Sequence, residues 1–193
     1  MHAKKDLSDP AKQLALKLFD DYNCHISTNI LLEAQEMYRY ATDFDKPSLF
    51  SSLHCASFFG IVEIVASLLQ TEGCDINQLD CGGSTPLIWA GRNGHEGVVE
   101  ILLGRIEVNP DKPGDDGRTQ LWWAAYKGHE GVVKMLLGRN VNPDKPNING
   151  RTPLYLAAWN GQEGVVKILP RRTDVNPNKL DKDGETPLDR ATK

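Results

Sequence analysis

The sequence predicts an all-α solenoid, in which similar helix–turn–helix units stack side by side with protruding hairpin fingers, behind an N-terminal helical cap. Three observations predict this fold. A Thr-Pro-Leu motif recurs, with changes, every 33 or 34 residues; a glycine lies nine residues after the start of the first four copies; and Val-Asn-Pro-Asp-Lys-Pro occurs twice at the same interval. Because three landmarks share one period, the repeat organises the chain. The copies of the first landmark begin at Ser51, Thr85, Thr119, Thr152 and Thr186.

Each unit is expected to begin with a short helix. Thr85 is a favourable N-cap residue, and Pro86 suits the first helical position, because the N–H that it lacks has no partner there. Ala90 and Gly91 place small side chains on one side of the helix, where a neighbouring helix can approach closely. Gly94 ends the helix, since glycine accepts the left-handed conformation at a helix C-terminus.

A second helix is expected over residues 95–103. Val98, Val99 and Leu102 form an apolar stripe at helical spacing, and burying one such side chain stabilises a fold by roughly 1.5–3 kcal/mol. The following stretch, residues 108–118, is rich in Asn, Pro, Asp and Gly, which is typical of a turn, and we expect it to project as a finger. The Asp-Lys pairs at residues 45–46, 111–112 and 144–145 are expected to aid solubility, because exposed ion pairs contribute little to stability.

A unit of this length that opens with Thr-Pro-Leu and continues as helix, glycine turn, helix and finger resembles the ankyrin repeat. The resemblance covers residues 49–193 and implies an elongated stack with a concave face. The chain departs from the family pattern in places: only His54 keeps the histidine after the leucine, Gln120 replaces a proline, and Pro170 interrupts a second helix. The expected units are residues 49–82, 83–116, 117–149 and 150–183, with a partial unit at 184–193.

The units are also similar to the ankyrin arrays of fungal NACHT-type (NLR-like) receptors. The segments that carry this resemblance are Gly-His-Glu-Gly-Val-Val, at residues 94–99 and 128–133, and the Val-Asn-Pro-Asp-Lys-Pro segments that follow them. In those receptors the ankyrin units form a C-terminal sensor behind a nucleotide-driven switch. The resemblance therefore implies a sensing array that has no nucleotide chemistry of its own.

The two ends of the chain depart from the repeat. Residues 1–48 do not follow the period, although helices are expected over residues 9–19 and 30–41. We interpret this segment as a cap, because the end of a stack needs a shielded outer face; a junction with another domain is the alternative. At the other end, the partial unit leaves the apolar side of the fourth unit partly open. We therefore expect a monomer, or weak self-association through this end.

Composition argues against two classes of partner. The 193 residues carry a net charge of −4 at pH 7, whereas a sequence-independent grip on nucleic acid needs a face rich in lysine and arginine. No apolar run approaches the roughly 20 residues that span a membrane, and no secretory signal is recognisable. The four cysteines form no Cys-x-x-Cys pair, so we interpret them as reduced thiols of a cytoplasmic protein.

The sequence contains no motif for catalysis or for a cofactor, and we predict that the protein is not an enzyme. The His-Glu pairs at residues 95–96 and 129–130 resemble half of the zinc motif His-Glu-x-x-His, but valine occupies the position of the second histidine. An enzyme or metal-binding protein is the less favoured alternative, because the spacing of its candidate ligands matches no zinc pattern. Those ligands are His54, Cys55, Cys74 and Cys81.

The candidate binding site is the surface on which the units differ. Packing positions such as Val98, Val132 and Val165 are identical, whereas residues near the end of the first helix and beside the fingers vary. In the ankyrin family this part of the unit lines the concave face, and aromatic and arginine side chains there are suited to a protein or peptide partner. The candidates are Arg92, Asn93, Tyr126, Lys127, Trp159, Asn160, Trp122, Tyr155, Arg118 and Arg151.

These residues predict a non-catalytic scaffold that binds a protein or peptide on its concave face. Two alternatives remain open. Trp122 can instead pack between units, as we expect for Trp89, Trp123 and Leu156, which correspond to a buried helix position. The whole array can also be a structural spacer that displays other domains and binds nothing through this face.

Overall fold

The computed structural model describes residues 51–192, and every regular element in this part of the chain is a helix. The prediction of an all-α fold is confirmed. The helices are α3 (Ser52–Phe59), α4 (Val62–Leu68), α5 (Pro86–Asn93), α6 (Glu96–Leu103), α7 (Gln120–Lys127), α8 (Glu130–Leu137), α9 (Pro153–Trp159), α10 (Glu163–Ile168), the 3₁₀ turn η2 (Leu169–Arg171) and α11 (Pro187–Ala191).

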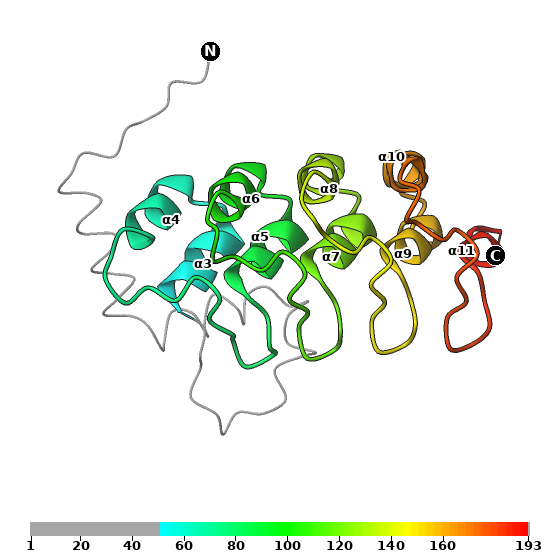
Figure 1. Cartoon of the computed structure of the whole chain (residues 1–193), viewed down its shortest axis with the longest axis horizontal. Helices are drawn as coiled ribbons and strands as arrows, with labels where there is room; N and C mark the ends of the chain where they lie inside the picture. Colours follow the sequence, from blue (N-terminus) through cyan, green and yellow to red (C-terminus); the bar gives the residue numbers. More distant parts are fainter. Residues whose placement is uncertain (1–50, 193) are drawn as a thin grey trace, which may run out of the picture.

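The helix pairs stack into one elongated array (Figure 1). The first helices of the units, from α3 to α11, lie in one row, the second helices lie in another, and the connecting loops project from the first row as fingers. The first helices pack more closely than the second helices do. Gly91 allows a close approach at one of these contacts, because a Cβ atom on it would lie only 3.0 Å from the Cβ atom of Gln120. We call the side on which the first helices meet the fingers the inner face.

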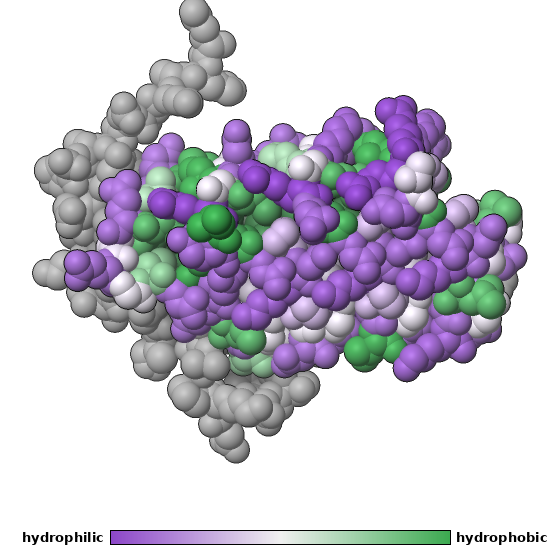
Figure 2. Space-filling model, in the orientation of Figure 1, coloured by the Kyte–Doolittle hydropathy of each residue, from purple (hydrophilic) through white to green (hydrophobic). Residues whose placement is uncertain are grey.

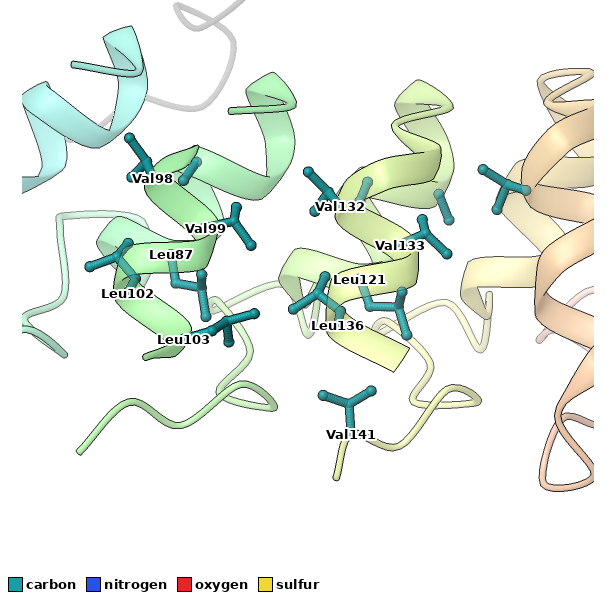
Figure 3. Packing of buried hydrophobic residues seen from close by; sticks show 14 of the residues in the cluster. Leu87, Val98, Val99, Leu102, Leu103, Leu121, Val132, Val133, Leu136 and Val141 are labelled. Atoms are coloured by element: carbon teal, nitrogen blue, oxygen red, sulfur yellow. The ribbon is translucent and has the colours of Figure 1, made fainter. Parts of the chain in front are cut away.

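An aliphatic core runs between the two rows of helices (Figure 3). The stripe of Val98, Val99 and Leu102 on α6 is fully buried, together with Leu87 from α5. The same positions on α7 and α8 repeat this packing in the next unit. Since each side chain in such a core stabilises the fold by roughly 1.5–3 kcal/mol, a row of equivalent residues holds neighbouring units together. The expected register of the second helices is therefore confirmed.

The ends of the first helices follow the predicted pattern. The Oγ1 atom of Thr85 accepts a hydrogen bond from the N–H of Ile88, and Gly94 ends α5 with a φ of 74°. The ring of His129 lies against this glycine and its Nε2 atom bonds to the carbonyl oxygen of Arg92 at 3.1 Å. A Cβ atom on Gly94 would lie 2.6 Å from that ring. Glycine is therefore suited to this turn for two reasons: it adopts the left-handed backbone conformation, and it leaves room for the His129 ring of the next unit.

The fingers are joined by hydrogen bonds, which gives the Asp-Lys pairs a structural role that we did not predict. The Oδ2 atom of Asp111 accepts from the backbone N–H of Asn142 at 2.8 Å, and Lys145 donates to the carbonyl oxygen of Asp111 at 2.6 Å. Asp144 and Lys179 repeat the arrangement one unit further. Each aspartate and lysine therefore bonds to a backbone group of a neighbouring finger.

Two further expectations concern the ends of the array. Pro170 does interrupt the second helix of the fourth unit: α10 ends at Ile168, and a 3₁₀ turn takes over. Residues 1–48, for which we predicted a helical cap or a junction, lie outside the described residues. Among residues 51–192 no helix is long and apolar enough to cross a membrane.

Candidate functional site

Aromatic and arginine side chains gather along the inner face. Four residues, one from each of four consecutive units, occupy the same register position near the end of the first helix. We call them the inner-face ladder: Phe58, Arg92, Tyr126 and Trp159. Three of them were predicted site residues, and all four are at least partly exposed.

Three of the four ladder residues, Phe58, Arg92 and Trp159, pack on a residue of the next unit. The Phe58 ring meets the Trp89 ring edge-to-face at 5.7 Å, and the Cζ atom of Arg92 lies 4.1 Å from the centroid of the Trp123 ring. Such cation–π contacts contribute roughly 0.5–2 kcal/mol each. The ladder therefore joins the units while it forms part of their surface.

The third unit carries an aromatic cluster with cations around it. Tyr126 stacks on the Trp122 ring with centroids 5.6 Å apart, and it meets Trp123 edge-to-face. Arg118 lies 4.7 Å from the centroid of Trp122, and the Nζ atom of Lys127 lies 5.6 Å from the centroid of Tyr126. Stacking restricts the conformations of these side chains, so they would lose less entropy in a contact than mobile side chains do.

Trp159 is the most exposed member of the ladder, with 41% of its surface accessible. Arg151 and Arg190 lie 4.9 and 4.3 Å from its centroid. Arg151 also pairs with two carboxylates, from Asp181 at 3.2 Å and Asp183 at 3.1 Å. Although burial opposes it, hydrogen bonding to these carboxylates raises the pKa of the Arg151 guanidinium. The Trp159 ring therefore packs on two arginines, of which Arg151 is held in place by carboxylates.

Two predicted site residues do not reach the surface. Trp122 is 4% exposed and Tyr155 is 1% exposed, and both belong to a buried cluster with Ile88, Trp123 and Leu156. Burial raises the pKa of Tyr155 to about 12. The structure therefore corrects the expectation that these side chains touch a partner: rings of this size fill the space between neighbouring first helices. Trp89, Trp123 and Leu156 are buried as expected.

Trp122 also takes over the role of a histidine. In the first unit the Nε2 atom of His54 bonds to the carbonyl oxygen of Ser84 at 3.0 Å, just before the next helix cap. Two units later, the Nε1–H group of Trp122 donates to the carbonyl oxygen of Arg151 at 3.1 Å, at the equivalent place. At Trp122 the departure from the histidine pattern therefore keeps the hydrogen bond between units.

The two predicted asparagines have a local role. The side-chain amides of Asn93 and Asn160 donate to the carbonyl oxygens of Trp89 and Leu156, four residues earlier, at 2.9 and 2.8 Å. These bonds add a side-chain donor to carbonyl groups in the last turns of the first helices; the Leu156 carbonyl also accepts from the backbone N–H of Asn160 at 3.0 Å.

Sequence analysis missed one contributor to the site. Arg190 lies in the partial unit, at the register position of Trp89 and Trp123, and packs on Trp159. Comparing register positions one unit further along the chain would have found it.

The proposed metal ligands do not converge. The ring nitrogens of His54 bond to Ser51 and to the carbonyl oxygen of Ser84, and burial lowers the pKa of this histidine. Cys55 is buried, which raises its pKa to about 11, whereas Cys81 is exposed. Within residues 51–192 no group of three or more His, Cys, Asp or Glu side chains could hold a metal ion.

The surface has no continuous apolar band in the view of Figure 2. Hydrophilic residues cover most of the described surface there, and hydrophobic residues form separate patches. Recognition at such a surface depends on a few well-placed side chains rather than on bulk hydrophobicity.

Comparisons with known proteins agree with this architecture. A family model described as ankyrin repeats (three copies) matches residues 28–113, 53–147 and 106–181. The first stretch begins at residue 28 and so reaches into the segment that precedes the described units. A human relative, ankyrin repeat and SAM domain-containing protein 3, is 37% identical over 62 residues. Those residues are 32% of this chain and 10% of the relative, so the similarity spans a small part of that protein.

Proposed function

Because this chain belongs to the ankyrin-repeat family, whose repeats generally mediate protein–protein interaction, we propose that its inner face binds a protein or peptide partner and catalyses no reaction. Trp159 is the observation that carries the proposal. A tryptophan ring that is 41% exposed and supported by two arginines offers a large contact area at little cost in side-chain entropy. Tryptophan, tyrosine and arginine dominate the residues that carry binding energy at interfaces.

The energetics of the face favour recognition over a purely structural role. A surface that only covered a core would gain nothing from leaving Trp159 and Tyr126 partly exposed, since burying a large ring contributes up to about 3 kcal/mol. Arg92 is stacked on the Trp123 ring, and this stacking fixes the direction of its N–H groups. A guanidinium held in this way loses less entropy when it binds a carboxylate or a carbonyl group.

A comparative pull-down tests this proposal. The wild-type chain is compared with a triple inner-face variant, Arg92→Ala/Tyr126→Ala/Trp159→Ala. A matched control variant, Glu100→Ala/Lys134→Ala/Lys167→Ala, changes three exposed residues on the second helices. Thermal melts of all three proteins establish that each is folded at the assay temperature.

The two outcomes distinguish a protein-binding array from a structural spacer. A protein that is retained by wild type and by the control variant, and lost by the inner-face variant, supports recognition through the inner face. If all three chains capture the same proteins, or none captures any, the proposal fails. The array is then better described as a spacer that displays other domains.

We also propose that the array is the sensor portion of a fungal NACHT-type receptor in the cytoplasm. The near-identity of Gly-His-Glu-Gly-Val-Val and Val-Asn-Pro-Asp-Lys-Pro between units supports this proposal. Immunoprecipitation of the endogenous protein, followed by mass spectrometry, tests it. Peptides of a nucleotide-binding module on the same polypeptide support the receptor, and an endogenous polypeptide with the mass of this chain alone contradicts it.

A further inference from the structure

The spacing of the inner-face ladder favours one backbone conformation in a peptide partner. Its members, Phe58, Arg92, Tyr126 and Trp159, come one from each of four consecutive units and share one register position. The first helices that carry them pack directly side by side. Packed helix axes lie about 8–10 Å apart, so neighbouring ladder positions are separated by about the same distance.

An extended peptide matches this distance with every third residue. Polyproline-type and β-type backbones advance about 3.1–3.4 Å per residue, so three residues span about 9–10 Å. A helical peptide advances about 1.5 Å per residue and needs six or seven residues for the same span. The two shapes therefore predict different spacings of contact residues in the partner.

The members of the inner-face ladder offer different chemical groups. Arg92 offers a guanidinium whose stacking on Trp89 and Trp123, at 5.2 and 4.1 Å, fixes its orientation. Planar guanidinium groups in fixed orientation pair well with carboxylates. Tyr126 and Trp159 offer partly exposed rings, on which proline rings or aliphatic side chains can pack.

We propose that the inner-face ladder binds an extended acidic peptide, in which a carboxylate side chain meets Arg92 and apolar or proline side chains meet Tyr126 and Trp159 at successive three-residue intervals. The expected pattern is acidic-x-x-apolar-x-x-apolar, in one chain direction. This inference rests on the proposed function and adds the class and the conformation of the partner.

Selection from a displayed library of random 12-residue peptides tests the inference directly. The wild-type chain is expected to enrich peptides with an aspartate or glutamate three residues away from an apolar residue, and a second apolar residue three further on. The Arg92→Gln variant is expected to lose the acidic preference and to keep the two apolar positions. The Arg92→Glu variant is expected to enrich lysine or arginine at that position.

Synthetic peptides give the quantitative arm of the test. A fluorescein-labelled peptide with the three-residue spacing is compared, by fluorescence polarisation, with a peptide of the same composition and a four-residue spacing. We expect at least tenfold weaker binding of the second peptide, and similar weakening of the first peptide by Trp159→Ala. The Glu100→Ala/Lys134→Ala/Lys167→Ala variant is expected to bind the first peptide as wild type does.

The outcomes distinguish failure of the inference from failure of the proposed function. Enriched peptides with contacts seven residues apart, or no enrichment at all, overturn the extended peptide, even where the inner-face variant loses a partner in the pull-down. Peptides that bind the inner-face variant and wild type with equal affinity overturn both the inference and the proposed function, because such peptides attach outside the inner face. Equal binding of the two synthetic spacings also overturns the inference.

Discussion

The guanidinium of Arg92 lies 4.1 Å from the ring centroid of Trp123, across the junction between the second and third units. Two units later the partners exchange places: the ring belongs to Trp159, at the register of Arg92, and the guanidinium belongs to Arg190, at 4.3 Å. One register position therefore carries the cation in one unit and the ring in another. The contact between units is kept, while the side chain at this register position changes along the array.

Double-mutant cycles measure whether this contact stabilises the array. Arg92→Ala and Trp123→Leu are expected to show a coupling free energy of unfolding of about 0.5–2 kcal/mol, because the pair is a partly buried cation–π contact. Leucine is chosen since Leu156 occupies the same register position. Pairing Arg92→Ala with the distant Lys167→Ala is the control and should show additivity. Additive effects in both cycles would mean that Arg92 and Trp123 are only neighbours.

Replacing Gly94 by alanine is expected to destabilise the fold more than replacing Gly161. Both glycines have positive φ, 74° and 65°, which costs an alanine roughly 1–2 kcal/mol. A Cβ atom on Gly94 would also displace the His129 ring, whereas a Cβ on Gly161 has no atom within 4 Å. Urea denaturation of both variants should show an excess of about 1 kcal/mol for Gly94→Ala. Equal losses would show that the His129 contact contributes nothing.

Gln120→Pro is expected to stabilise the protein by roughly 1–3 kcal/mol. Gln120 is 0% exposed, and both polar atoms of its side chain lack a hydrogen-bond partner. Proline occupies the equivalent position at Pro86 and Pro153, so its fixed φ fits this backbone. Calorimetry compares the variant with Gln120→Ala, which removes the polar atoms alone. A proline variant less stable than the alanine variant would show that the ring does not fit beside Gly91.

Stability is expected to fall as the pH drops through about 6.5. Burial lowers the pKa of His54 and of His129 from the ordinary histidine value of 6.5, so near this pH the unfolded chain binds protons that the folded chain does not. The nearby Asp80 carboxylate opposes the effect at His54 without reversing it. The stabilisation that comes from the neutral histidines is complete above pH 6.5. It decreases as the pH falls, and it is fully lost once the pH is below the pKa values of the folded chain.

Chemical denaturation between pH 5 and pH 8 checks this expectation. His129→Gln should flatten the dependence, because Gln162 makes the same contact with the preceding unit without titrating. A slope that is unchanged in His129→Gln would assign the whole dependence to other groups, and a rise in stability toward pH 5 would contradict the expectation for both histidines.

Weak self-association is expected through the last helix. Leu188 is 69% exposed, although the leucine at its register position is buried in each of the four preceding units. Burying such a side chain against a second copy is favourable by roughly 1.5–3 kcal/mol, which supports only weak association. Light scattering should show a mass that rises with concentration, and Leu188→Lys should remove the rise. A constant monomer mass for wild type would exclude this contact.

The architecture could be predicted from the sequence because it rests on local and periodic signals. Thr85 acts as a helix cap, Pro86 acts through its missing N–H, and Gly94 acts through its left-handed backbone. Each of these effects involves residues close together in the chain. Val98 and Leu102 repeat with a period that the sequence displays directly. Such signals need no knowledge of distant contacts, and the structure confirms the helices that they predict.

The site could be predicted only in outline. Register comparison identified Arg92, Tyr126 and Trp159, and these three do lie on one face. It could not decide whether a ring at the neighbouring register position is exposed, because Trp122 and Tyr155 are as suited to a surface contact as to a core.

The sequence by itself determined the period, the helices and their caps, since these depend on residues close together in the chain. The tertiary structure alone decided which aromatic rings are buried, which arginines rest on them, and that Arg190 completes the support of Trp159. Those outcomes depend on the distance between first helices of neighbouring units, where small residues such as Gly91 allow close packing. That distance also spaces the exposed side chains along the inner face.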